Sequence, residues 1–290
     1  MIIIQLKGGL GNQMFQYALY RELLHRGKEV KIDDETGFEN DRLRVPVLQR
    51  FGIEYDRASR EEIVAITDSK MDIFSRIKRK LFGRQTSRID ETEGMFDPGI
   101  LELNDAYLVG YWQSEKYFAT PEVIAQIREA FGRRPQEIMH DSVSWSTLQQ
   151  IECSESVSIH VRRTDYLDQE HIGIHNICTE NYYKNAIRMV REQHPNAVFF
   201  IFTDDKEWCR EHFKGHNFIN VELQEGENTD IADMILMSRC RHHIIANSSF
   251  SWWAAWLGDT GDGLLIAPER WINNRKMDDI YTDRMIKVEV

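Results

Sequence analysis

Two neighbouring arginines at the end of a predicted strand carry the strongest chemical signal in this chain. In the segment Ser156–Asp165, apolar and polar residues alternate, which is typical of a half-buried strand. Arg162 and Arg163 follow at the point where that strand ends. A pair of guanidinium groups in this position can hold a phosphate through paired hydrogen bonds. The segment therefore predicts an anion-binding site, and the alternative is an edge strand with surface charges.

Polar residues also follow three other predicted strands. They are the glycine turn Lys7–Gln13, the run Thr203-Asp204-Asp205 and the run Asn247-Ser248-Ser249. In open parallel sheets, ligands bind outside the carboxyl ends of the strands. Four polar strand ends in one chain, with the arginine pair counted among them, therefore favour a ligand-binding site.

The acidic run and the serine run each have a functional and a structural interpretation. Asp204 and Asp205 could hold a ribose, a base edge or a metal ion, or they could cap the helix that follows. Ser248 and Ser249 could cradle an anion together with the first helix amides, or could provide a simple N-cap. The tryptophans that come next, Trp252, Trp253 and Trp256, are predicted to pack in the core.

The glycine turn Gly8–Gln13 lets the backbone approach a ligand closely at a helix N-terminus. Gly9 and Gly11 match the first two glycines of a G-x-G-x-x-G dinucleotide motif, but Met14 occupies the third position. A dinucleotide fingerprint therefore has weak support, while a plain tight turn and a loop that faces a ligand both stay open. The Asn12 amide could donate to a phosphate or sugar oxygen.

Motifs for metal binding and for hydrolysis are missing from the sequence. It contains no Asp-x-Asp, no His-Glu-x-x-His and no cysteines at zinc-binding spacing. It also contains no Gly-x-Ser-x-Gly elbow and no P-loop. We therefore expect no metal, and we expect a diphosphate leaving group to be stabilised by arginine and backbone dipoles instead.

Composition and charge indicate an acidic globular protein. The 290 residues are 42% hydrophobic and 29% charged, and the net charge of −11 argues against general nucleic-acid binding. The four cysteines lie far apart, which predicts reduced thiols and a cytoplasmic location. We expect neither a signal peptide nor a membrane span, since no apolar run approaches about 18 residues. The basic patch Ser75–Phe82 is either a solvated helix face or, through Arg76–Lys80, a peripheral contact with an anionic inner-membrane surface.

The elements that must position these residues alternate along the chain. The N-terminal part predicts strands at 2–6, 29–32 and 106–111 and helices at 14–25 and 121–131. The C-terminal part predicts strands at 157–161, 197–203, 218–223, 243–246 and 264–267, with helices at 181–193, 207–213, 231–240 and 250–257. The polar stretch 132–155 predicts an irregular connection between domains. Such alternation predicts an α/β fold with parallel sheets that helices cover on both faces.

Four segments together resemble glycosyltransferase family 11, the bacterial α-1,2-fucosyltransferases. They are Gly8–Ala18, Gly110–Phe118, His160–Tyr166 and Asn247–Trp253, in the family's order, and the resemblance runs from residue 2 to about residue 271. It implies a GT-B-like architecture, with two Rossmann-like domains and the active site in the cleft between them. Residues 1–150 would form the acceptor side and residues 151–290 the GDP-fucose-binding side.

The resemblance further implies a reaction. L-Fucose would pass from GDP-β-L-fucose to the 2-hydroxyl of a galactoside, with inversion and without an essential metal or other cofactor, in cell-surface glycan or O-antigen synthesis. His160, Arg162, Arg163 and Asp165 match the HxRRxD motif shared with α-1,6-fucosyltransferases, whose first arginine contacts the donor diphosphate. The donor-binding residues implied are Gly11, Asn12, His160, Arg162, Arg163, Asp204, Asp205, Ser248, Ser249 and Phe250. Thr164 stands where the family usually has glycine.

A general base could come from the acidic residues Asp165, Asp168 and Glu170 that follow the arginines. Glu170 lies at the spacing where the α-1,6 relatives place a proposed base, while Asp165 is better suited to orienting an arginine. His160 could take part in catalysis, orient a neighbour or simply pack. The competing interpretations are a non-catalytic nucleotide-sugar-binding protein and an NAD-linked oxidoreductase; within the transferases, GDP-mannose is another conceivable donor.

Overall fold

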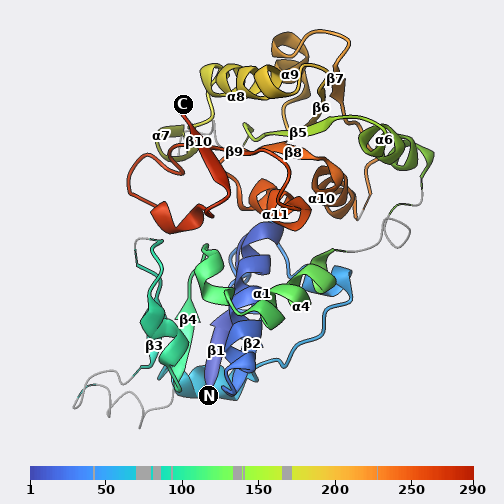
Figure 1. Cartoon of the computed structure of the whole chain (residues 1–290). Coiled ribbons are helices and arrows are strands. Elements are labelled where there is room, and N and C mark those ends of the chain that lie inside the picture. The colour runs from blue at the N-terminus through green and yellow to red at the C-terminus, as the bar shows by residue number, and fades with distance from the viewer. Residues whose placement is uncertain are drawn as a thin grey trace. The chain divides into compact units, whose positions relative to one another are not determined.

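Two parallel β-sheets organise the chain, one in each of two units, Met1–Ile127 and Arg128–Val290 (Figure 1). The computed structural model describes residues 1–41, 43–69, 80, 86–92, 94–132, 139, 141–164, 172–226 and 228–290. Each unit has parallel strands joined through helices, as Rossmann-like folds do. The predicted α/β class with two Rossmann-like parts is confirmed.

The second unit begins at Arg128, earlier in the chain than the predicted division between residues 150 and 151. Helix α6 (Ser142–Glu152) packs against α10 (Thr229–Arg239) and so belongs to this unit. Asp141 starts α6, because its carboxylate accepts a hydrogen bond of 2.8 Å from the Ser144 amide. The irregular connection predicted for 132–155 is therefore wrong for residues 142–152. The roles assigned to the two domains stay predictions.

In the first unit the strand order is β2-β1-β4-β3, and all described pairs are parallel. Its strands are β1 (Ile2–Gln5), β2 (Val30–Asp33), β3 (Arg88–Asp90) and β4 (Ala106–Val109). Its helices are α1 (Leu10–His25) and α2 (Arg60–Ile66), with short 3-10 turns η1 (Leu48–Phe51), η2 (Pro98–Glu102) and η3 (Glu115–Phe118). Helix α4 (Pro121–Phe131) begins in this unit. The short strand β3 was not predicted.

Helix α1 begins at Leu10, four positions before the predicted start, because the Gly9 carbonyl accepts the amides of Asn12 and Gln13 at 3.0 and 3.1 Å. The turn ahead of it is tight. Gly8 has φ 77°, and a Cβ at this position would lie 2.6 Å from Nδ2 of Asn12. Only glycine fits this backbone at low cost.

Gln13 fastens the glycine turn to a neighbouring loop. Its side chain is fully buried, and its amide nitrogen donates to the carbonyls of Gly8 and Val45, both at 2.9 Å. Its amide oxygen accepts from the Val47 backbone N–H at 2.9 Å. A buried side chain with three satisfied hydrogen bonds fixes the loop geometry at the carboxyl end of β1.

In the second unit the strand order is β10-β9-β8-β5-β6-β7, again with parallel pairs. The strands are β5 (Ser156–Val161), β6 (Val198–Thr203), β7 (Phe218–Asn220), β8 (His242–Ile244), β9 (Leu265–Pro268) and β10 (Met285–Val288). Besides α6 and α10, the helices are α7 (Ile172–His175), α8 (Glu180–Gln193), α9 (Lys206–His212) and α11 (Ser249–Gly258), with the 3-10 turn η5 (Asp278–Ile280). Strand β10 was not predicted.

Strand β5 lies in the middle of its sheet, between β6 and β8. All six of its residues are buried, so the predicted half-buried strand and the edge-strand alternative are both wrong. The alternating polar residues mislead because helices cover both faces of the sheet. The chain runs from β5 to β6 and β7 on one side, and later to β8, β9 and β10 on the other. The strand order therefore reverses between β5 and β8, and a crevice at such a switch point is where parallel sheets bind ligands.

Helix α11 carries three tryptophans of the second unit. Trp252 and Trp253 are fully buried and Trp256 is 6% exposed, which confirms the predicted core packing. The Trp252 indole donates a hydrogen bond of 2.7 Å to the carbonyl of Ile280, so its polar atom is satisfied inside the core. Within the described ranges, no helix is both long enough and apolar enough to cross a membrane.

Replacing Gln13 with leucine should lower the free energy of unfolding by roughly 2–4 kcal/mol, because two carbonyls and one amide lose their buried partner. Chemical denaturation measures the change. The matched control is Gln126→Leu, since Gln126 is exposed and bonds only to Arg21 at the surface; this change should stay within about 0.5 kcal/mol. Equal destabilisation by the two variants would contradict the role given to Gln13.

Candidate active site

The arginine pair and the aspartate pair lie side by side at the carboxyl ends of β5 and β6. These strands pair in parallel along their whole length, so the residues that follow them must meet. Nε of Arg162 lies 3.3 Å from a carboxylate oxygen of Asp204, and Nε of Arg163 lies 3.0 Å from one of Asp205. Two predicted polar strand ends are thus brought together by direct ion pairs.

Asp204 and Asp205 hold in place the residues Arg162–Thr164 that follow β5, here called the arginine loop. Asp204 accepts hydrogen bonds from the Arg163 amide at 2.9 Å and from the Thr164 hydroxyl at 2.7 Å. Asp205 accepts from the Trp208 amide at 3.1 Å and caps α9, which confirms the helix-capping interpretation for this residue. Contact of either aspartate with a nucleoside stays a prediction.

The two arginines have different surroundings. The Arg163 guanidinium is pinned between the Asp205 carboxylate and the Trp208 ring, whose centroid lies 4.5 Å away. The Arg162 side chain is 38% exposed and is paired with the 19% exposed Asp204. An ion pair with this exposure stabilises by about 1 kcal/mol or less. Arg162 is thus the more exposed of the two guanidinium groups and the better placed to meet an incoming anion, whereas Arg163 is positioned as a structural support.

His160 connects β5 to the start of α11. Its side chain is 6% exposed, its ring centroid lies 5.6 Å from that of Phe250, and its carbonyl accepts the Tyr183 hydroxyl at 3.0 Å. Burial lowers the pKa of His160 to about 3, and the positive charge of Arg162 adds to this. The imidazole is therefore neutral near pH 7. Its Nδ1 atom is buried without a hydrogen-bond partner among the described residues, so it has capacity for a ligand.

Asn247 organises the loops around the start of α11. Its amide nitrogen donates to the carbonyls of His175 and Trp271, both at 3.0 Å, and its oxygen accepts from the Cys178 thiol at 3.4 Å. Ser248 stands at the N-cap position, but its hydroxyl does not bond to the helix amides. The simple N-cap interpretation therefore fails for its side chain.

The first amides of α11 lie at the switch point of the sheet. The first turn of any helix leaves its N–H groups without partners inside the helix. In α11 this turn contains Ser249 and Phe250, and it follows β8, the strand next to β5. Ser248, Ser249 and Phe250 thus come from the strand end that neighbours the arginine pair, in an arrangement suited to an anion.

The sequence interpretation missed Asp233. It lies in the second turn of α10, a helix that packs against α11 and β6. The pKa of Asp233 is raised to about 7, chiefly by burial and also by the nearby carboxylate of Asp230, while the charge of Lys206 opposes both. Lys206, whose charge acts on Asp233, directly follows Asp205 in the chain. A carboxyl group with a pKa raised this far is a functional-site candidate. The signal available in the sequence was its place three residues after Asp230, which belongs to the predicted helix cap.

In the first unit, the predicted ligand loop contains Asn12 and Gly11. The Asn12 side-chain oxygen accepts a hydrogen bond of 2.7 Å from the Gln113 amide, which joins the carboxyl ends of β1 and β4. These are the strands between which the order of the first sheet reverses. Gly11 is buried in the first turn of α1. Gln113 was not singled out as a site residue, although its segment carries part of the family resemblance.

Residues 99–288 match the sequence profile described as Glycosyl transferase family 11. The chain belongs to this family. An Escherichia coli protein named alpha-1,2-colitosyltransferase is 35% identical over 99% of this chain and 99% of its own length. The Escherichia coli O-antigen biosynthesis glycosyltransferase WbnK is 29% identical over 98% of this chain and 99% of its own. Galactoside alpha-(1,2)-fucosyltransferase 1 of Ateles belzebuth is 34% identical over 36% of this chain and 30% of its own length.

The family 11 chain is therefore an enzyme, a glycosyltransferase, as the resemblance predicted. A non-catalytic nucleotide-sugar-binding protein and an NAD-linked oxidoreductase are not favoured. The structure also argues against the dinucleotide site. Asp33, the first carboxylate after β2, is 1% exposed and accepts from the Tyr107 hydroxyl at 2.6 Å and from the amides of Glu35 and Thr36 at 3.0 Å. It has no capacity left for a ribose.

Several predicted residues of the family 11 enzyme lie outside the described residues. They are Asp165, Asp168, Glu170 and the basic patch Ser75–Phe82, except for Lys80. The four cysteines are all described and carry free thiols.

A group of metal-ligand type, formed by Glu155, His194 and His242, lies near the amino ends of β5 and β8, away from the arginine pair. Nδ1 of His242 accepts the Leu264 amide at 2.9 Å, so the ring proton lies on Nε2, which donates to Glu155 at 2.8 Å. A metal on Nε2 would displace that proton onto Nδ1, against the Leu264 N–H. These residues fit a hydrogen-bonded ion cluster better than a metal site.

The Asp233→Asn variant should gain thermal stability over the parent protein as pH rises. The unfolded-state carboxyl ionises near pH 4, while the folded one stays protonated up to about pH 7. The parent therefore loses stability between these values, and asparagine does not. The difference in Tm should grow from pH 5 to pH 7 and stay constant above pH 8. The matched control is Asp283→Asn, at an exposed aspartate. If the difference in Tm from the parent depends on pH in the same way for both variants, the raised pKa of Asp233 is contradicted.

Proposed function

We propose that this family 11 enzyme transfers L-fucose from GDP-β-L-fucose to the 2-hydroxyl of a galactoside, with inversion and without a metal. The observation that carries the proposal is the partly exposed Arg162 guanidinium, paired with Asp204 at the carboxyl end of β5, the strand that borders the switch point of the second sheet. The relatives' names agree with an α-1,2 linkage, in one case on a galactoside. A guanidinium group and the first amides of a helix, at the same edge of a sheet, suit a diphosphate leaving group.

In the proposed reaction, the acceptor hydroxyl oxygen forms a bond to the anomeric carbon from the face opposite GDP. The bond from that carbon to the β-phosphate oxygen breaks, and its electron pair stays on the phosphate. Arg162 moves from Asp204 to this growing charge, and the amides of Ser249 and Phe250 with the Ser248 hydroxyl complete the cradle. Stabilisation of this kind acts most strongly in the transition state and so raises kcat.

The support around Arg162 keeps the reacting groups in register. Arg163 stays fixed between Asp205 and Trp208, so the loop does not have to refold when Arg162 changes partner. His160, neutral near pH 7, is proposed to donate or accept a single hydrogen bond to the donor rather than to exchange a proton with the acceptor. Its contact with Phe250 would then align β5 with the α11 amides.

The nucleoside is proposed to lie over the acidic group formed by Asp204, Asp205 and Asp233. An ionised carboxylate accepts the two neighbouring N–H groups on the Watson–Crick edge of guanine, and no other common base presents that pair. Asp233 is the group whose ionisation such a contact would favour most, since burial otherwise keeps it protonated. Binding of GDP would then lower the pKa of Asp233.

The proton of the acceptor hydroxyl needs a base, and Glu170 is proposed for this role, with Asp165 orienting an arginine. The acceptor is proposed to bind the first unit. Gly11 and Asn12 keep their predicted role in donor binding, and Gln113 holds the Asn12 side chain. O-antigen or another cell-surface glycan is the acceptor class that the name of WbnK suggests. A cytoplasmic enzyme with peripheral membrane contact through residues 76–80 completes the proposal.

A second donor is favoured by one observation. The relative with 35% identity over almost the whole of both chains is named a colitosyltransferase. Colitose is the 3-deoxy form of L-fucose, so the two donors differ in one hydroxyl. A site built to bond that hydroxyl would discriminate strongly, whereas one that leaves it in solvent would accept both.

Replacing Arg162 with alanine should lower kcat at least about 100-fold, because one preorganised contact to a leaving-group charge is worth about 3–4 kcal/mol. GDP release measures the rate, and circular dichroism checks the fold. Arg239→Ala, at an exposed arginine at the end of α10, is the matched control and should keep parental turnover. An Arg162→Ala enzyme with a tenth of parental turnover would exclude this role.

Parallel assays with GDP-fucose, GDP-colitose and GDP-mannose on a panel of β-galactosides should give the highest kcat/KM for GDP-fucose. Adding a chelator should leave that value unchanged, because arginine and helix amides, not a cation, meet the diphosphate. Loss of activity with the chelator that added Mg²⁺ or Mn²⁺ restores would overturn metal independence. A higher kcat/KM for GDP-colitose would reassign the donor.

A further inference from the structure

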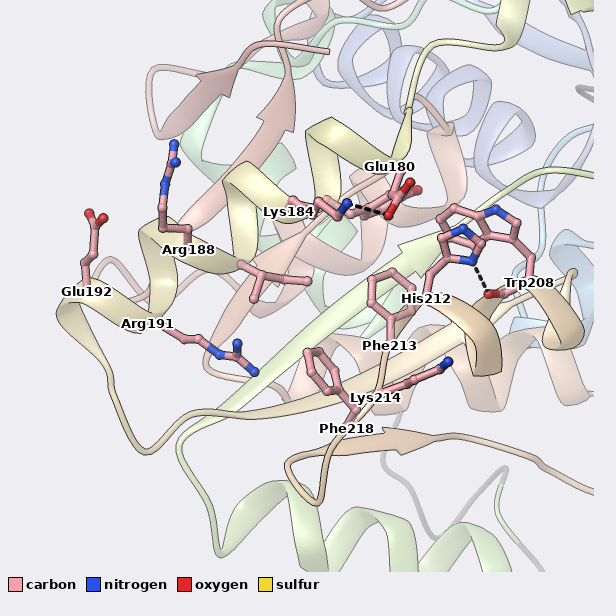
Figure 2. Close-up of a pocket in the computed structure, with 12 residues that line it drawn as sticks. Glu180, Lys184, Arg188, Arg191, Glu192, Trp208, His212, Phe213, Lys214 and Phe218 are labelled. Atoms are coloured by element: carbon pink, nitrogen blue, oxygen red, sulfur yellow. Dashed lines mark hydrogen bonds and ion pairs between the residues drawn. The ribbon is translucent and has the colours of Figure 1, made fainter.

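The second unit has a groove of about 510 Å³ between α8 and α9 (Figure 2). Its floor is apolar and is formed by Tyr183, Ile187, Phe213 and Phe218. Tyr183, Ile187 and Phe213 are each at most 8% exposed, so these side chains are part of the core and only their edges reach the groove. The groove is lined by α8, by α9 and by residues between α9 and the start of β7.

Cations outnumber anions around the groove, although the whole chain carries a net charge of −11. Lys184 pairs with Glu180 at 2.6 Å, which neutralises one of each sign (Figure 2). Arg188, Arg191 and Lys214 remain, against the single carboxylate of Glu192. Within the described parts of the chain, none of these three cations forms an ion pair with a carboxylate. All three side chains are exposed.

Arg191 shows how the groove combines charge with an apolar surface. Its guanidinium lies 5.2 Å from the ring centroid of Phe218 and 5.4 Å from that of Phe199, and Figure 2 shows it directed toward Phe218. Its further contact is a long hydrogen bond of 3.4 Å to Asn217. A cation over an apolar floor is positioned for a ligand with an anionic head and an apolar body.

The rings of the groove have little free face for a planar base. Trp208 has the Arg163 guanidinium at 4.5 Å and the His212 ring stacked at 4.1 Å with an interplanar angle of 16°. Phe213 meets Tyr183 edge-on at 87°. What the groove offers is ring edges and the Ile187 side chain, which suit a flexible aliphatic chain better than a nucleobase.

The groove also shares side chains with the arginine loop. Tyr183 on the floor donates its hydroxyl to the His160 carbonyl at 3.0 Å, and Trp208 on the wall carries the Arg163 guanidinium. A ligand here would touch the residues that support the loop while leaving the anion-binding edge open.

We propose that this groove binds an anionic lipid. The alkyl chain would lie on the floor formed by Tyr183, Ile187 and Phe218, and the phosphate head would be held by Arg188, Arg191 and Lys214. Burial of the lipid's alkyl chain supplies apolar contact, and the three cations without a carboxylate partner in the described parts of the chain select for negative charge. The proposal goes beyond the sugar-transfer reaction and does not depend on it, because it concerns binding to the second unit in the absence of any sugar nucleotide.

Three soluble probes test the chemistry on the whole protein: decyl phosphate below its critical micelle concentration, decyl maltoside and inorganic phosphate. Decyl phosphate should raise Tm in a saturable way. The maltoside, with the same chain but no charge, and inorganic phosphate, with the charge but no chain, should each raise it far less. No shift with decyl phosphate, or an equal shift with either comparison probe, would overturn the proposal.

Charge reversal locates the site. In Arg188→Glu/Lys214→Glu the apparent affinity for decyl phosphate should fall about tenfold or more, as expected for two surface cations at an anionic lipid. The matched control Arg60→Glu/Arg239→Glu changes two exposed arginines outside the groove by the same net charge and should bind like the parent. If the variant Arg188→Glu/Lys214→Glu fails to fold, Arg188→Gln/Lys214→Gln replaces it, and its affinity for decyl phosphate should fall by a smaller factor. Equal affinities of the groove and control variants would place binding elsewhere.

Flotation with vesicles separates a lipid from a protein as the natural occupant. The parent protein should float with phosphatidylglycerol/phosphatidylcholine vesicles and not with phosphatidylcholine alone, and Arg188→Glu/Lys214→Glu should lower this flotation to what the basic patch at residues 76–80 alone supports. Flotation that persists unchanged in this variant, or its absence in the parent, would refute the lipid assignment and leave the groove to an acidic protein partner.

Discussion

The pairing of two arginines with two aspartates across the ends of β5 and β6 is the constraint on which the site depends. Adjacent guanidinium groups repel one another, and a loop that carried them alone would separate them. Asp204 and Asp205 neutralise that charge and also bond to the loop backbone and to helix α9. The loop is therefore assembled before a ligand arrives, which removes an ordering cost from binding.

The two arginines differ in solvent exposure and therefore in the role that each can take. Arg163 has a partly buried aromatic neighbour and a close carboxylate, so moving it would cost several contacts. Arg162 is the more exposed of the two, and its pair with Asp204 is screened by solvent. The carboxyl groups also differ, since Asp204 and Asp205 pair with arginines while burial raises the pKa of Asp233 to about 7. One strand edge thus combines fixed charges with groups that can change partner or protonation state.

Tyr183 and Trp208 link this edge to the groove between α8 and α9. Both side chains contribute to the core of the second unit and contact the arginine segment from behind, Tyr183 through a carbonyl and Trp208 through a guanidinium. Packed cores transmit small displacements because they contain few voids. A ligand in the groove would consequently act on the support of the arginine loop rather than on the reacting groups.

Local sequence determined the chemical groups and the fold class. The arginine pair, the aspartate pair and the serine run could be recognised because each follows an apolar strand within a few residues, and the strand–helix alternation that predicts parallel sheets is equally local. The family followed from the order of short motifs such as His160–Tyr166. Helix α6 and strands β3 and β10 escaped this interpretation, because their sequences are short or polar and their stability comes from distant partners.

Tertiary structure decided which groups meet and what burial does to them. Sequence patterns could not tell that β5 is a central strand, since helices on both faces bury its serines and histidine as well as its apolar residues. Nor could they tell that Asp204 faces Arg162 while Asp205 faces Arg163, or that Asp233 is dehydrated beside Lys206. Ion pairing and pKa depend on distance and on the exclusion of water, and both are set by contacts between residues far apart in the chain.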